Sequence, residues 1–290
     1  MENIRGIVLM ITAMAAFSLE DMVIKTAAET LPTGQILVIL GAAGALVFAL
    51  LSLKSRKRLF TRDALSMAVL LRSAGELVAA LGYVTALALV PLATAAAILQ
   101  VTPLAITMFA ALFLGESVGW RRWSAVCIGF FGVILIIQPG LDGFQPASLF
   151  ALIGVAGLVL RDLATRRIPA QVSTSVVSFY GFIAIFVAGI SLLASGQQSV
   201  MPAPGLMLWL AAAALFGTTG YYAIVAAMRL GDTAAIIPFR YARLLFSLVI
   251  GVLVFAEYPD NLTLLGATIL LATGLYSYAR ELVLARSATA

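Results

Sequence analysis

Ionisable side chains inside long apolar stretches are the residues of this sequence best suited to carry chemistry. Three acids and three bases are placed in this way: Glu20, Asp21, Arg72, Glu76, Arg240 and Arg243. A charge at the centre of a membrane-spanning helix costs about 3 kcal/mol unless it is paired or hydrated. Each of these residues therefore needs an oppositely charged partner or a water-filled cavity, and such a cavity can hold a charged solute.

The spacing of these charges separates them into two groups. Arg72 and Glu76 are four residues apart and share a helix face, so they can pair with each other. Arg240 and Arg243 are three apart and have no acid in their own stretch. They pair with one of the three acids named above, or one of them binds an anionic group of a substrate through its planar guanidinium. We expect Arg240 to face the substrate and Arg243 to be structural.

Aromatic and amide side chains gather in the same stretches. Their rings and polar tips suit a planar, apolar solute that carries a charged group, although plain helix packing is the alternative for either Tyr83 or Tyr222. Tryptophans near the ends of stretches, such as Trp120, are typical of the membrane interface. The predicted substrate-binding residues are Glu20, Arg72, Glu76, Tyr83, Gln100, Tyr222, Arg240 and Tyr241.

Composition requires a membrane around these residues. Hydrophobic residues make up 62% of the 290 and charged residues 11%, far from the balance of a soluble domain. The net charge of +5 lies in short clusters between stretches, which argues against nucleic-acid binding. The sequence has no histidine, a single cysteine, and neither a nucleotide-binding loop nor a zinc-protease motif. We therefore predict neither an enzyme nor a bound metal or cofactor.

Ten apolar runs are long enough to cross the bilayer as helices, which predicts an all-α, polytopic membrane protein. They cover residues 4–25, 34–53, 64–87, 91–114, 121–137, 147–165, 172–194, 205–228, 232–255 and 262–283. Basic residues concentrate in every second connection between runs, most densely at residues 54–62. The connections on the other side contain a single basic residue, Lys25. The positive-inside rule therefore places both termini in the cytoplasm.

The two halves of the chain repeat each other. Glu257 follows Glu116 by 141 residues, and Tyr222 follows Tyr83 by 139. We predict one five-helix repeat over residues 1–140 and a second over 141–290. Because five is odd, the second repeat enters the membrane from the opposite side, as in secondary carriers. Pro103 and Pro238 each interrupt a corresponding helix and are the predicted hinges.

Glycines three residues apart, such as Gly129 and Gly132, put small residues on one helix face. We interpret these pairs as packing within the chain, and so expect a monomer.

The sequence resembles the drug/metabolite transporter superfamily, in particular its ten-helix EamA type. The resemblance rests on two helix ends, Phe113-Leu114-Gly115-Glu116 and Val254-Phe255-Ala256-Glu257, the second with alanine in place of the family's glycine. The sequence as a whole is similar to bacterial YddG-type exporters of aromatic amino acids. The resemblance implies a multi-pass protein of the bacterial inner membrane, with phenylalanine, tyrosine or tryptophan as substrate. It also admits uptake of a charged metabolite such as S-adenosylmethionine, and a membrane enzyme or a partner subunit is the alternative outside transport.

The predicted topology can be tested with reporter fusions. Reporters at positions 60 and 290 should behave as cytoplasmic, and reporters at 142 and 198 as external, because the basic connections stay inside. An external reporter at position 60 would contradict the ten-helix arrangement.

Overall fold

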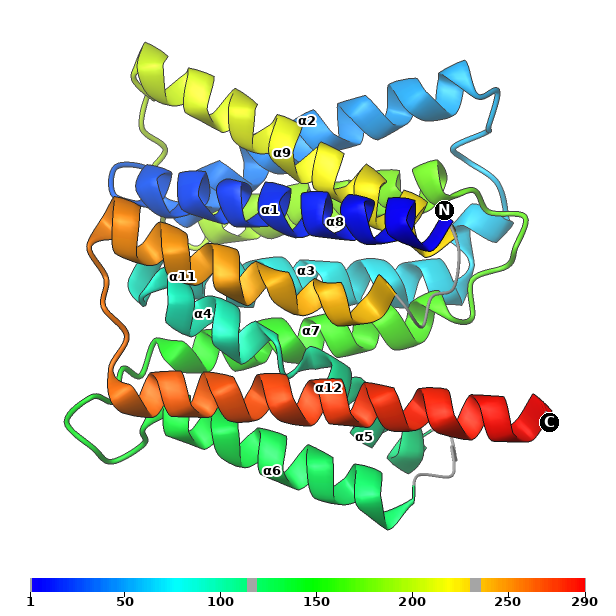
Figure 1. The fold of residues 1–290 in the computed structure, drawn as a ribbon. Helices are drawn as coiled ribbons and strands as arrows, with labels where there is room; N and C mark the ends of the chain where they lie inside the picture. The colour runs from blue at the N-terminus through cyan, green and yellow to red at the C-terminus, as the bar shows by residue number, and fades with distance from the viewer. Residues whose placement is uncertain (1, 114–118, 230–235, 290) are drawn as a thin grey trace. The chain divides into compact units, whose positions relative to one another are not determined.

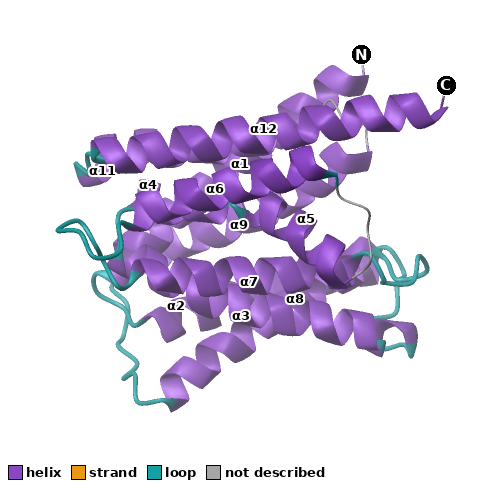
Figure 2. Cartoon of the chain, turned by 90° about the horizontal axis from the view of Figure 1, so that it is seen from below, coloured by secondary structure: helices purple, strands orange, loops and turns teal. Residues whose placement is uncertain are grey.

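The structure is a computed structural model that describes residues 2–113, 119–229 and 236–289. Helices and their connecting loops account for these residues, and they contain no strand (Figures 1 and 2). Ten helices within the described ranges are long and apolar enough to cross a membrane, which confirms the predicted all-α, ten-span fold. The predicted ends at residues 114 and 232 lie outside the described residues, and the other predicted ends lie within six residues of the helix ends in the structure.

Eight of the spans are single helices, and two are divided. The single helices are α1 (Glu2–Ala28), α2 (Thr33–Lys54), α3 (Met67–Leu89), α6 (Trp120–Ile137), α7 (Ser148–Thr165), α8 (Thr174–Ala194), α9 (Pro204–Arg229) and α12 (Asn261–Thr289). The fourth span consists of α4 (Leu92–Leu99) and α5 (Thr102–Phe113), and the ninth contains the 3-10 helix η2 (Ile237–Tyr241) followed by α11 (Ala242–Phe255). A short 3-10 helix, η1 (Asp63–Leu65), precedes α3.

The chain forms two compact units, and neither coincides with a half of the sequence. Unit 1 comprises Met1–Ser18, Val90–Leu149 and Gly220–Ala290, and unit 2 comprises Leu19–Leu89 and Phe150–Thr219. Each unit therefore takes helices from both predicted repeats, whose boundary at residue 140 remains a prediction. Residues 114–116 of the first motif lie outside the described residues.

Unit 2 is held together by close backbone contacts at glycines. In the contact between α2 and α8, a methyl group on Gly41 would overlap the backbone of Phe186. In the contact between α3 and α7, a methyl group on Gly157 would overlap the backbone of Ala79. Since lipid provides no hydrophobic force between helices, small residues that allow close approach are what hold them. These glycines pack within the chain, as predicted.

Unit 1 contains the corresponding contact between α6 and α12. A methyl group on Gly132 would lie 2.9 Å from the carbonyl oxygen of Gly266. Gln138 directly follows α6 and Asp260 directly precedes α12. The Gln138 amide donates to Asp260 at 2.5 Å, and Asp260 accepts the backbone N–H of Thr263 at 2.6 Å. Burial raises the pKa of Asp260, but the hydrogen bonds from Thr263 and Gln138 lower it by more, to below its ordinary value.

The last two residues of the second motif, Ala256 and Glu257, each have a structural role at the end of α11. Ala256 has φ 52° and ψ 32°, a left-handed conformation that glycine adopts without strain. The following N–H, that of Glu257, donates to the carbonyl of Gly251 at 2.9 Å and closes the helix end. The carboxylate of Glu257 accepts the N–H of Leu92 at 2.7 Å and so caps the first residue of α4. The motif thus ends one helix and begins another.

Replacing Ala256 with glycine should stabilise the protein by about 1 kcal/mol, because it removes the left-handed strain of a side chain with a Cβ. The measurement is thermal unfolding of the purified protein in detergent. The matched control is Ala211→Gly at an exposed position within α9, where the same change should destabilise by about 1 kcal/mol. Equal effects of the two changes would show that the conformation of Ala256 carries no strain.

Candidate functional site

The fourth span is interrupted in its middle by the sequence around Pro103. Proline has no N–H to donate to the carbonyl four residues earlier, which belongs to Leu99. The Thr102 hydroxyl donates to that carbonyl at 2.6 Å, so the carbonyl is satisfied although the helix is broken. Helix α4 ends at Leu99 and α5 begins at Thr102, which leaves Gln100 and Val101 between them. The predicted interruption of this helix is confirmed, whereas its use as a hinge remains a prediction.

The ninth span has a second irregular segment, around Pro238. Residues Ile237–Tyr241 form a 3-10 helix before α11 begins. A 3-10 stretch of this length that leads directly into an α-helix is uncommon, and such stretches often mark a functional hinge. The Gln100 amide donates to the backbone carbonyl of Arg240 at 3.4 Å, which joins the two irregular segments within unit 1. Two predicted site residues thus meet at the interruptions.

The side chains around this junction differ in their burial and in their contacts. Tyr241 is buried, and a methyl group on Gly274 of α12 would overlap its hydroxyl, so its ring is held by packing. Arg240 is half-buried. Arg243, one turn further on, places its guanidinium 5.3 Å from the centre of the Phe17 ring of α1, a cation–π contact that fits the structural role expected for it.

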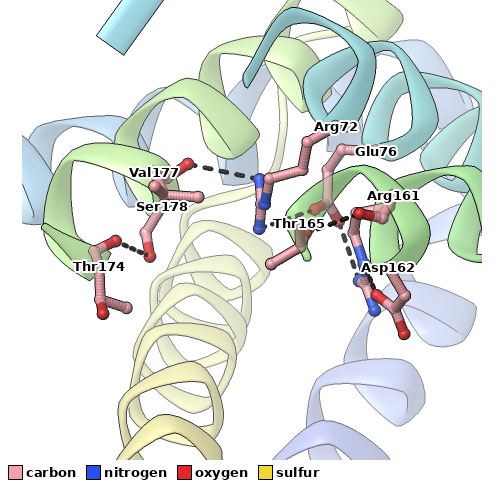
Figure 3. A network of polar contacts seen from close by, with 8 residues as sticks. All are labelled: Arg72, Glu76, Arg161, Asp162, Thr165, Thr174, Val177 and Ser178. Carbon is pink, nitrogen blue, oxygen red and sulfur yellow. Dashed lines mark hydrogen bonds and ion pairs between the residues drawn. The ribbon is translucent and has the colours of Figure 1, made fainter. Parts of the chain in front are cut away.

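Unit 2 contains a network of four charges, shown in Figure 3. Arg72 and Glu76 pair within α3 at 3.4 Å, as their spacing predicts. Both are buried, and the Arg72 guanidinium also donates to the carbonyl of Val177 in α8 at 3.3 Å. Gly181 makes room for this guanidinium, since a methyl group there would lie 2.7 Å from it.

Arg161 and Asp162 of α7 complete the network. The Arg161 guanidinium lies 3.5 Å from Glu76 and 2.7 Å from Asp162. Two positive and two negative charges therefore balance at one place, which removes most of the cost of burying them. Sequence reasoning assigned Arg161 to a basic connection and missed this contact. A signal was present, because Arg161-Asp162 follows Glu20-Asp21 by 141 residues in the repeat.

The network lies toward one end of its helices. Arg72 is five residues after the start of α3, Arg161 is four before the end of α7, and Val177 is in the first turn of α8. The connections at this end, residues 55–66 and 166–173, are rich in arginine and lysine. By the predicted topology this is the cytoplasmic end, so the network joins three helices there.

A second buried polar contact lies further along α3. The Tyr83 hydroxyl donates to the carboxylate of Asp21 at 2.9 Å, and Asp21 is only 2% exposed. One turn along α1, the Lys25 ammonium donates to the carbonyl of Leu87 at 3.4 Å. Glu20, on a different face of α1, packs against Gly217, where a methyl group would overlap its carboxylate.

The two tyrosines expected to be equivalent have different surroundings. Tyr83 is buried and bonded to Asp21, whereas Tyr222 in α9 is 67% exposed. The predicted site residues are divided between the two units. Unit 2 holds Glu20, Arg72, Glu76 and Tyr83, and unit 1 holds Gln100, Tyr222, Arg240 and Tyr241.

Neutralising Glu76 as Glu76→Gln should destabilise the protein by about 3 kcal/mol, because Arg72 and Arg161 would lose the carboxylate between them. The apparent melting temperature in detergent measures this loss. The same substitution at the exposed Glu29 should leave the melting temperature nearly unchanged. If the two variants have the same melting temperature, the network does not stabilise unit 2.

Comparison with known proteins agrees with this fold. Residues 4–138 match the EamA-like transporter family. A crystal structure that is 20% identical in sequence superposes with a TM-score of 0.63 over 98% of this chain and 99% of the other. This likeness supports the fold alone.

Curated relatives carry several different names. The S-adenosylmethionine uptake transporter of Rickettsia conorii is 27% identical over 66% of this chain. The riboflavin transporter of Vibrio cholerae is 30% identical over 62% of this chain and 60% of its own length. The pseudopaline exporter CntI of Pseudomonas aeruginosa is 26% identical over 91% of this chain and 93% of its own.

The match to the Rickettsia conorii transporter spans 64% of that protein's length. With the ten spans, these likenesses indicate a multi-pass membrane protein whose residues 4–138 match the EamA-like transporter family.

Proposed function

We propose that this chain is a secondary carrier that moves a small organic metabolite across the bacterial inner membrane by alternating access. The observation that carries the proposal is the hydrogen bond between Gln100 and the Arg240 carbonyl, which joins the interruptions of the fourth and ninth spans. Discontinuous helices expose backbone groups and helix ends at membrane depth, where carriers bind solutes. The named transport activities of the relatives support the same class of function.

The substrate is a metabolite that carries a charged group. Arg240 lies on the irregular segment and offers a planar set of donors that suits a carboxylate or phosphate. Gln100 adds an amide with donors and an acceptor. The charges of unit 2 are engaged with each other and hold helices together, which favours a structural role for them.

Aromatic amino acids are a narrower candidate within this class. The tyrosines that suggested them are held by packing or bonding at Tyr83 and Tyr241. The relatives described above are named for S-adenosylmethionine, pseudopaline and riboflavin, not for aromatic amino acids. A charged metabolite such as S-adenosylmethionine is therefore the second candidate, and export and uptake are directions available to the same carrier.

Counterflow in proteoliposomes made from the purified chain tests the proposal. Vesicles loaded with unlabelled phenylalanine, tryptophan, S-adenosylmethionine or riboflavin should accumulate the labelled form of at least one of them, and uptake should saturate. Vesicles prepared in the same way without the protein are the control. If none of these solutes, and no further carboxylated metabolite, shows saturable counterflow, the chain is not a carrier of this class.

For a transported carboxylate, Arg240→Lys should lower transport by about tenfold, because lysine keeps the charge but loses a bidentate hydrogen bond of about 1.5 kcal/mol. Analogues without the carboxylate should be transported equally by both proteins. Arg243→Lys is the matched control, since the side chain of Arg243 stacks on Phe17. It should leave the ratio between the two solutes unchanged. A shift of that ratio in Arg243→Lys but not in Arg240→Lys would contradict the assignment.

A further inference from the structure

An open groove runs along the contact between α6 and α12 in unit 1, apart from the interruptions proposed to bind a substrate. Its volume is about 410 Å³, and its lining residues come from these two helices only: Trp120, Arg121, Ser124, Ala125, Ile128, Ala272, Thr273 and Tyr276. Figure 1 shows α6 and α12 side by side. The helices touch at Gly132 and Gly266, and the groove lies on the side of that contact toward the start of α6.

The middle of the groove is apolar, because the hydroxyl groups of Ser124 and Thr273 are used within their own helices. The Ser124 hydroxyl donates to the carbonyl of Trp120 at 3.0 Å, and the Thr273 hydroxyl donates to that of Ile269 at 2.8 Å. A polar solute would find few partners here, whereas a hydrocarbon chain needs none. From Trp120 to Ile128 the groove follows α6 for about 12 Å, which approaches the depth of about 15 Å of one hydrocarbon leaflet.

The mouth of the groove is positively charged. Arg121 is exposed, and its guanidinium lies 5.5 Å from the centre of the exposed Trp120 ring. Arg122 follows directly, and Arg280 lies one turn beyond Tyr276 on the same face of α12. Arg121 stands in the first turn of α6, where the helix dipole adds positive potential rather than offsetting the charge of its guanidinium. An anion at this point relieves that repulsion.

We propose that this groove binds an anionic phospholipid of the surrounding bilayer. One acyl chain lies against Ala125, Ile128 and Ala272, and the headgroup phosphate accepts hydrogen bonds from Arg121. Trp120 begins its span, so it lies at the interface, where aromatic residues and lipid headgroups meet. The site is permanent and independent of transport, because it uses none of the residues at the interruptions.

The proposal is tested by lipid binding to the full-length protein in detergent. Phosphatidylglycerol should raise the melting temperature more than phosphatidylcholine of the same acyl chains. The Arg121→Gln variant should bind phosphatidylglycerol about fivefold more weakly, as expected for one arginine at an anionic membrane surface. Arg58→Gln, which removes one charge from an exposed loop residue outside the groove, should bind it like the unchanged protein.

A second variant tests the apolar part of the groove. Ala272→Phe fills the groove from an exposed position and should reduce the phosphatidylglycerol that remains bound after purification, as measured by native mass spectrometry. If Arg121→Gln and Arg58→Gln bind the lipid equally, or Ala272→Phe retains as much of it, the proposal is wrong. A dimer that Ala272→Phe converts to monomer would overturn it too, by making the groove an interface between two copies.

Discussion

The lack of water in the hydrocarbon core, which obliges the chain to satisfy every backbone polar group itself, is the constraint on which this structure depends. Most of the chain meets it with uninterrupted helices. Where the fourth span breaks, the Thr102 hydroxyl supplies the partner that the Leu99 carbonyl lacks, and where that span begins, Glu257 caps the N–H of Leu92. These side chains allow the span to be divided at membrane depth.

The same constraint governs the buried charges. Arg72, Glu76, Arg161 and Asp162 sum to no net charge, and the helices that carry them approach closely enough for ion pairing. Glycine makes that approach possible, because Gly181 leaves space for the Arg72 guanidinium and Gly75 brings α3 against the backbone of Arg161. Close helix packing and charge balance are thus two parts of one solution.

Features that depend on residues close together along the chain can be predicted from the sequence. Contacts that depend on how helices pack can be predicted much less well. Apolar runs locate the ten spans, proline locates the interruption at Pro103, and spacing predicts the pair Arg72–Glu76. The contacts of Glu76 with Arg161, of Tyr83 with Asp21 and of Gln100 with Arg240 join residues 62 to 140 positions apart. They depend on how helices rotate and cross, which hydropathy does not determine. The substrate is less predictable still, because relatives with similar helices carry different names.

The charge network of unit 2 and the interruptions of unit 1 are held by bonds of different strength, and this difference bears on where a solute is expected to bind. In unit 2 the partners are charged and buried, and breaking such a pair costs about 3 to 5 kcal/mol. In unit 1 the interruptions are joined by a neutral hydrogen bond of 3.4 Å from Gln100, and a bond of this kind contributes about 1 kcal/mol. A solute with its own donors and acceptors can replace that bond at little cost, but it cannot replace the ion pairs. For the proposed carrier we therefore place solute binding and release at the interruptions, and we expect the charge network to keep its own helices fixed.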